Sequence, residues 1–177
     1  MKEFEFTLKF ALADSGIDAN IYVDQLGEAG CTDALLGIGQ LGRIALDFSR
    51  DAENAMEAVK SALEDVMNAI PDARLIEASP DLVGISDIAS LIGVSRQNIR
   101  KLIINNIKTF PSPIHDGKSS IWHLSAVLNW FIDCKQKDIE PMLVEISIAN
   151  MQLNIAKEYS YANPHIQAEL TSVIIQN

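Results

Sequence analysis

Four polar side chains near the middle of the 177-residue sequence are of types that contact nucleic acid. Helical spacing places all four on or near one outer face of a single helix: Arg96, Gln97, Arg100 and Lys101. Arg and Gln can hydrogen-bond to base edges, and Arg and Lys can bind phosphates. The pattern therefore predicts a helix that contacts DNA.

Two short helices joined by a glycine turn are expected to position this face. Ser86 and Ser95 can cap the first and second helix, Gly93 can adopt the positive φ that ends the first, and Val94 can fill the turn. The apolar positions of the pair are expected to face inward: Ile88, Ala89, Ile92, Ile99 and Leu102. This spacing favours a DNA-binding helix-turn-helix, with a purely structural αα-hairpin as the alternative.

The residues that follow the second helix extend this interpretation. The stretch from Phe110 predicts two short extended runs around a His-Asp-Gly-Lys tip, and then a helix that Ser125 caps. The apolar face of that helix contains Val127, Trp130 and Phe131. Trp122 and Trp130 could stack on bases, but their positions favour a place in the core.

The stretch from about Leu82 to Phe131 resembles the winged helix-turn-helix of AlpA/excisionase-type and MerR-type DNA-binding domains. The residues that match the pattern of those domains, in order, are Phe110, Pro111, Pro113, Gly117, Trp122, Ser125, Val127 and Trp130. The resemblance implies that the second helix enters the major groove and that the wing touches the DNA backbone or minor groove. The implied DNA-binding residues are Ser95, Arg96, Gln97, Arg100, Lys101 and, in the wing, Lys118. The segment 103–109 lacks the extra basic residues of many relatives, which predicts modest affinity per protomer.

The charge of the chain is unevenly distributed. Residues 1–85 contain 6 Lys and Arg against 16 Asp and Glu, and residues 138–177 contain 1 against 5. Residues 86–137 contain 7 against 3, a net charge of +4 within a chain of net charge −10. A basic segment between acidic flanks is typical of a DNA-binding module whose charge the whole-chain average conceals.

The N-terminal segment, residues 1–80, predicts an acidic domain of the ferredoxin-like class. Strands are expected at Phe4–Leu12, Ala34–Ile38, Arg43–Phe48 and Ala73–Ile76, and helices at Ile17–Ala29 and Asp51–Ile70. A hairpin at Gly39–Gly42 joins the two middle strands. The order β-α-β-β-α-β is that of the ferredoxin-like fold, so we expect an α+β protein in which a winged helix-turn-helix domain (81–137) and C-terminal helices (138–177) follow.

The C-terminal segment is expected to mediate oligomerisation. Residues from Ile139 to Ile155 are apolar on nearly every side of one helix, so that helix must be buried. A homodimer held by these helices would bury it, and wedging between the two domains of one protomer is the alternative. Asn163 and Pro164 predict the start of a final helix.

Composition limits the remaining possibilities. The acidic start does not resemble a signal peptide, and no apolar run is long enough for a membrane helix, so a cytoplasmic location is expected. Cys31 and Cys134 lie far apart, and both are expected to be small buried residues. The three histidines are scattered, and Gly37, Gly39 and Gly42 precede a strand, so we expect no metal, cofactor or catalytic residues and no enzymatic activity.

The combined features favour a transcriptional regulator that binds double-stranded DNA at a short operator, at its own promoter or within a mobile element. One alternative is a regulator whose ferredoxin-like domain senses a small effector. The other is an antitoxin-like interaction protein whose acidic domain covers a basic partner.

Overall fold

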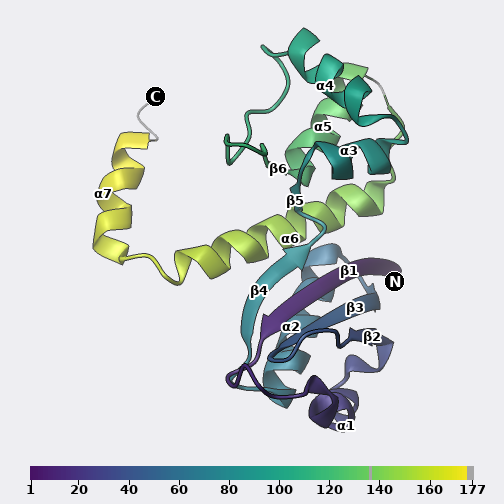
Figure 1. The fold of residues 1–177 in the computed structure, drawn as a ribbon, viewed down its shortest axis with the longest axis vertical. Helices are drawn as coiled ribbons and strands as arrows, with labels where there is room; N and C mark the ends of the chain where they lie inside the picture. Colours follow the sequence, from purple (N-terminus) through teal and green to yellow (C-terminus); the bar gives the residue numbers. More distant parts are fainter. Residues whose placement is uncertain (136, 175–177) are drawn as a thin grey trace.

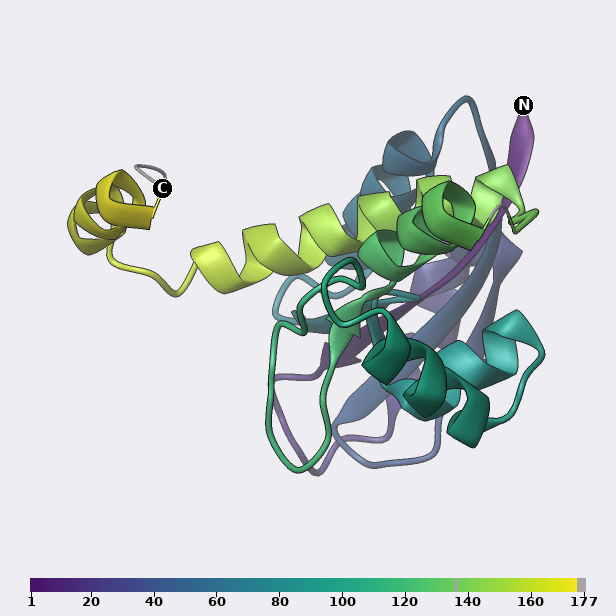
Figure 2. The ribbon, with the colours of Figure 1, turned by 90° about the horizontal axis from the view of Figure 1, so that it is seen from above.

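The computed structural model describes residues 1–135 and 137–174, and its architecture is mixed α/β. A four-stranded antiparallel sheet with its helices forms one part, here called the sheet unit, and a mainly helical part follows it (Figures 1 and 2). A long helix, α6 (Pro141–Tyr159), runs between the two parts, and α7 (Pro164–Ile174) projects from its far end. None of the described helices is long and apolar enough to cross a bilayer.

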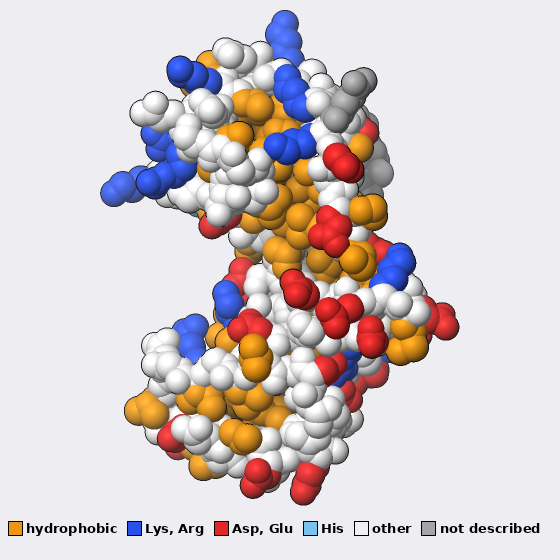
Figure 3. All heavy atoms as spheres, turned by 90° about the vertical axis from the view of Figure 1, so that its right-hand side faces the viewer, with side chains coloured by type: hydrophobic (Ala, Val, Ile, Leu, Met, Phe, Trp, Pro, Cys, Tyr) orange, Lys and Arg blue, Asp and Glu red, His pale blue; other side chains and the backbone are white. Residues whose placement is uncertain are grey.

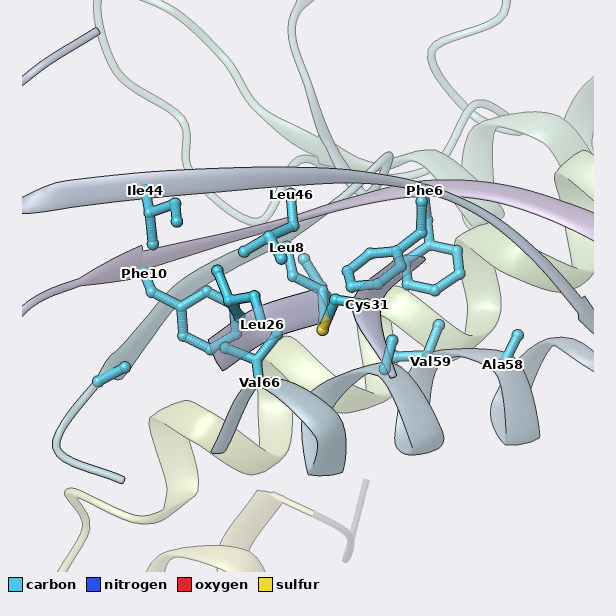
Figure 4. Packing of buried hydrophobic residues seen from close by; sticks show 14 of the residues in the cluster. Phe6, Leu8, Phe10, Leu26, Cys31, Ile44, Leu46, Ala58, Val59 and Val66 are labelled. Carbon is cyan, nitrogen blue, oxygen red and sulfur yellow. The ribbon is translucent and has the colours of Figure 1, made fainter. Parts of the chain in front are cut away.

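The sheet has the strand order β2-β3-β1-β4, with every neighbouring pair antiparallel. Its strands are β1 (Lys2–Ala11), β2 (Ala34–Gly37), β3 (Arg43–Ala52) and β4 (Arg74–Ser79). Alternate residues of β1 and β3 point toward α2 (Ala55–Ala69), as their apolar alternation predicts (Figure 4). The opposite face of these strands is largely exposed and polar.

The segment that connects β1 to β2 differs from the helix predicted at Ile17–Ala29. It contains a 3₁₀ turn (Ala19–Tyr22), a short helix α1 (Val23–Glu28) and a second 3₁₀ turn (Cys31–Asp33). Asp18 accepts a hydrogen bond from the Asn20 backbone N–H at 2.9 Å, which favours a local turn over a regular helix at this point. Gly27 within the stretch also lowers its helix propensity.

Strand β3 continues beyond the predicted end at Phe48 and carries Arg50 to the inner face of the sheet unit. Arg50 is 7% exposed, and its guanidinium contacts Asp33 and Asp65 at 2.8 Å each. These carboxylates compensate the buried charge, so the strand can place an arginine where its pattern requires an apolar residue. Asp65 of α2 is therefore a partner of a buried arginine, although an acid-rich helix is by itself typical of a solvated face.

The turn between β2 and β3 is fixed by a close backbone approach. Gly42 has φ +71°, and a Cβ atom there would lie 2.5 Å from the Cα of Ser15. Its N–H donates to the Ile17 carbonyl at 3.0 Å. Only glycine fits this position without a shift of the neighbouring chain.

The helical unit has a separate apolar core. It contains β5 (Leu82–Val83), α3 (Ile85–Ile92), α4 (Arg96–Asn105), β6 (Trp122–His123) and α5 (Leu124–Lys135). Strands β5 and β6 form a small antiparallel pair at its base. Apolar residues from α3, α4, α5 and the intervening segment share this core.

Helix α6 is buried between the two units of the same chain. Ile146 and Ala149 belong to the core of the sheet unit, while Ile139 and Val144 pack against the core of the helical unit. Most of the apolar side chains of residues 139–155 are thus covered within one protomer, while Ile148 and Ile155 remain 40% and 46% exposed. The wedged arrangement is observed, so burial of the inner side of this helix does not by itself require a second chain.

The two cysteines differ in environment. Cys31 is 3% exposed in the sheet unit, where burial and the nearby Asp65 raise the pKa of its thiol to about 11. Cys134 is exposed on α5, so the prediction that both are buried is wrong for this residue. Cys134 lies with polar residues on the solvent-facing side of α5. The sequence pattern alone does not distinguish the buried position of Cys31 from the exposed position of Cys134.

Candidate nucleic-acid interface

Helices α3 and α4 meet at the predicted glycine turn. Gly93 has φ +73° and ends α3, and the Val94 N–H donates to the Ala89 carbonyl at 2.9 Å. Ser95 caps α4, because its hydroxyl accepts the Asn98 N–H at 3.2 Å. The turn therefore fixes the direction in which α4 leaves α3.

The observed start of α3 differs from the prediction that Ser86 caps this helix. The helix begins at Ile85, so Ser86 lies inside its first turn and Gly84 occupies the cap position. The Asp87 carboxylate accepts the Gly84 N–H at 2.8 Å. An acid in the first turn thus satisfies the N–H of the cap residue, and the prediction that Ser86 caps α3 is wrong.

The inward positions of the pair are buried as predicted. Ile88, Ala89, Ile92 and Ile99 are each less than 8% exposed, and Leu102 is partly buried against the same core. Val94 is instead 38% exposed and does not fill the turn.

The outer face of α4 presents the four predicted DNA-contacting side chains to solvent. Arg96, Gln97, Arg100 and Lys101 are all exposed. In the described part of the chain, no carboxylate lies within salt-bridge distance of the three basic groups. Unpaired guanidinium and ammonium groups need not break an internal ion pair to bind phosphate.

The distribution of charge on the surface follows the two units. Figure 3 shows one side of the molecule, where Lys and Arg lie mainly over the upper part, which is the helical unit. Asp and Glu lie mainly over the waist and the lower part. Because like charges repel, a polyanion is expected to approach the helical unit rather than the sheet unit.

Two exposed apolar side chains lie next to the basic face and were not identified from the sequence. Ile104 is 70% exposed on α4, four residues after Arg100, and Ile107 is 76% exposed just beyond the end of the helix at Asn105. Together with Arg100 they line a groove of about 380 Å³ between α4 and residues 110–122. The position of Ile104, one helical turn after Arg100, was the sequence signal that could have indicated this groove.

The 110–121 segment forms a loop rather than two paired runs. Its antiparallel pairing is a single bridge between His115 and Ile121, in which the Ile121 N–H donates to the His115 carbonyl at 3.0 Å. Strand β6 pairs with β5 instead of with the first run of the loop. Lys118 lies at the exposed tip, on an element separate from α4.

The aromatic residues of this unit form its core and do not stack outward. Phe110 lies 6.0 Å from Trp122 and 5.0 Å from Trp130, measured between ring centroids, and both pairs pack edge to face. The indole of Trp122 donates to the Pro111 carbonyl at 3.0 Å, which holds the loop against the core. The core interpretation of both tryptophans is confirmed.

Ser125 does not cap α5 as predicted. The helix begins at Leu124, and Ser125 is buried with its hydroxyl 3.3 Å from the Met151 sulfur on α6. The Leu124 N–H donates to the Asp81 carbonyl at 2.7 Å. The start of α5 is thus held by the junction before β5, which no local pattern indicated.

A buried polar network joins the helical unit to α6. Asp81 is fully buried, and its carboxylate oxygens lie 2.8 Å from His123 Nδ1 and 2.8 Å from Asn154 Nδ2. Asn154 also pairs with both the N–H and the carbonyl of Ala78 in β4, at 2.8 Å each. No partner of His123 could be predicted from the sequence, because the three residues of this network are distant along the chain.

Comparisons of the chain with protein-family models, with curated proteins and with solved structures give no match. Among residues 1–135 and 137–174, no cluster of His, Cys, Asp and Glu is arranged to hold a metal ion. The charge and the exposure of the side chains on the outer face of α4 are therefore the observations that bear on what this face binds.

Proposed function

We propose that this protein is a cytoplasmic, sequence-specific regulator of transcription that binds double-stranded DNA. The observation that carries the proposal is the outer face of α4, where Arg96, Arg100 and Lys101 are exposed and have no acidic partner among the described residues. In this proposal α3 and α4 are a helix-turn-helix, and α4 enters the major groove. Ser95 lies at the start of that helix, and Gln97 is one of the residues that would contact base edges.

The remainder of the chain fits the same proposal. The 110–121 segment acts as the wing, and Lys118 at its tip contacts the DNA backbone or the minor groove. The strand order β2-β3-β1-β4 and the helices on one sheet face support a ferredoxin-like assignment for the sheet unit. Its acidic surface would repel the duplex and keep the sheet unit away from it.

The proposal separates residues that read bases from residues that bind phosphate. A binding sequence is first selected from a random DNA pool with the full chain. Arg96→Ala is expected to weaken binding to that sequence by about 1–3 kcal/mol and to relax the preference at one base position. Lys118→Ala is expected to weaken binding to all sequences about equally and to lower the salt dependence by about one phosphate contact.

The matched control is Arg74→Ala, which removes an exposed arginine from the sheet unit. Because Arg74 lies outside the proposed interface, its variant should bind the selected DNA as the unmodified chain does. Unchanged affinity and selectivity in both Arg96→Ala and Lys118→Ala would exclude this mode of binding.

A further inference from the structure

The C-terminal helix α7 has an apolar face that nothing in the described chain covers. Its apolar residues recur at helical spacing, and none of its residues is buried: Ile166, Leu170, Val173 and Ile174. Figures 1 and 2 show the helix projecting away from the rest of the molecule. An isolated helix of this length is only marginally stable in water, so packing against another surface is needed to hold it.

An apolar groove without an occupant lies where α7 begins. It has a volume of about 630 Å³ and lies between β4, the 110–121 segment and the C-terminal end of α6. Its apolar lining is Ile76, Leu82, Ile114, Ile155 and Tyr159. Ala162 and, from α7 itself, Gln167 also line it, while the four apolar side chains of α7 are not part of its lining.

Most polar side chains that line this groove already have partners within the chain. The Lys157 ammonium donates to the Ile76 carbonyl at 2.7 Å, and His123 and Asn154 belong to the network around Asp81. A polar ligand would have to compete with these bonds, whereas an apolar helix would leave them intact. The groove therefore favours an apolar occupant.

We propose that α7 of one copy of this chain occupies the groove of a second copy, and that the exchange is reciprocal across a two-fold axis. Such an isologous pair matches each uncovered helix with an uncovered groove. Helix α7 carries Glu169 as its only acidic or basic residue apart from His165, so it is a part of this acidic chain that a second copy can approach with little repulsion. The proposal is independent of DNA binding.

The apolar area available is sufficient for a stable dimer. Seven large apolar side chains between residues 155 and 174 are at least 46% exposed. Burial of a side chain of this kind removes roughly 60–120 Å² from water, which gives on the order of 400–800 Å² per chain before the rest of the groove is counted. Stable interfaces bury about 800 Å² per partner.

Sedimentation of the full chain from about 1 to 100 µM tests the proposal with three single variants. Leu170→Asp places a charge on α7, and Ile155→Asp places one in the groove. Each is expected to weaken self-association at least about 100-fold, because every dimer has two copies of the altered contact. Leu41→Asp is the matched control: Leu41 is 62% exposed in the sheet unit, and this variant should dimerise normally.

Mixing the two defective variants distinguishes exchange from other dimers. A Leu170→Asp chain keeps an intact groove, and an Ile155→Asp chain keeps an intact α7, so an equimolar mixture should regain one proper contact and associate more tightly than either variant alone. A mixture no tighter than its components would overturn the exchange and favour α7 packing on α7. A wild-type monomer up to 100 µM, or a monomer that carries a small molecule in native mass spectrometry, would also overturn it.

Discussion

The sheet unit and the helical unit differ in how Arg50 and the two arginines of α4 are held. Arg50 in the sheet unit is 7% exposed and held between Asp33 and Asp65, whereas Arg96 and Arg100 in the helical unit are exposed and have no acidic partner among the described residues. A buried charge is retained only when its partners are fixed, so Arg50 serves the fold. The exposed arginines contribute little to the fold and remain available to bind an anion.

The largest expected difference between the two units concerns their cysteines. Because burial and Asp65 raise the pKa of Cys31 to about 11, its thiol is almost fully protonated at pH 8 and is also shielded from reagents. The exposed Cys134 should therefore react with iodoacetamide at least about 100-fold faster than Cys31. Peptide mass spectrometry over a time course measures both rates, and equal rates in the native protein would show that the sheet unit opens readily.

Removal of the buried arginine is expected to have the largest effect on stability. Arg50→Ala leaves Asp33 and Asp65 without their cation, and both carboxylates are only about a quarter exposed. The free energy of unfolding should fall by about 3–4 kcal/mol, near the lower end for a broken buried pair because of that exposure. Arg96→Ala is the comparison and should change stability by less than about 0.5 kcal/mol in urea unfolding. Equal losses would contradict the distinction between the two arginines.

Replacement of Asn154, whose buried amide lies between the two units, tests whether the units unfold together. Asn154→Ala removes its bonds to Ala78 and Asp81 and should lower the free energy of unfolding by about 2 kcal/mol. Asn129→Ala on the exposed side of α5 is the control and should have little effect. Tryptophan fluorescence reports only the helical unit, since both tryptophans are there, and far-UV circular dichroism reports both units. Transitions that coincide in the wild type but separate in Asn154→Ala would show that α6 couples the units, and full coincidence in the variant would refute this role.

A smaller effect is expected where α6 meets the sheet unit at the surface. The Glu145 carboxylate lies 2.9 Å from the Lys2 ammonium and also accepts the Ala55 N–H, and these bonds hold the pKa of Glu145 below its ordinary value of 4.5. Glu145→Gln should cost about 0.2–1 kcal/mol at pH 7. A depressed pKa stabilises the fold above the unfolded value and loses that contribution as pH falls through the folded value.

Urea unfolding of Glu145→Gln and wild type at pH 7 and at pH 3 checks this pH dependence. The difference in stability should be smaller at pH 3 than at pH 7, because the contribution of the carboxylate is lost as pH falls through its lowered pKa. Glu3→Gln, on the exposed side of β1, is the control and should show no comparable loss at either pH. A difference that grows toward low pH would contradict the assignment.

The sequence by itself determined the features that depend on local periodicity. The alternation along β1 and β3, the buried positions of α3 and α4 and the exposed basic face of α4 could all be predicted, because a side chain's direction follows from its place in a strand or helix. Asn163 was likewise identified as the cap of α7, and its side chain accepts the His165 N–H at 3.0 Å. In each case the cause lies within a few residues of its effect.

Tertiary structure alone decided the contacts between distant residues. His123 finds its partner 42 positions away, and Asn154 bonds to Asp81 across 73 positions, so neither pairing leaves a local pattern. The place of α6 was decided in the same way: an all-round apolar helix must be buried, but only the arrangement of the two cores shows that one chain covers most of it. Arg50 occupies an apolar position of β3 because two carboxylates from other elements meet it there, and strand periodicity contains no information about them.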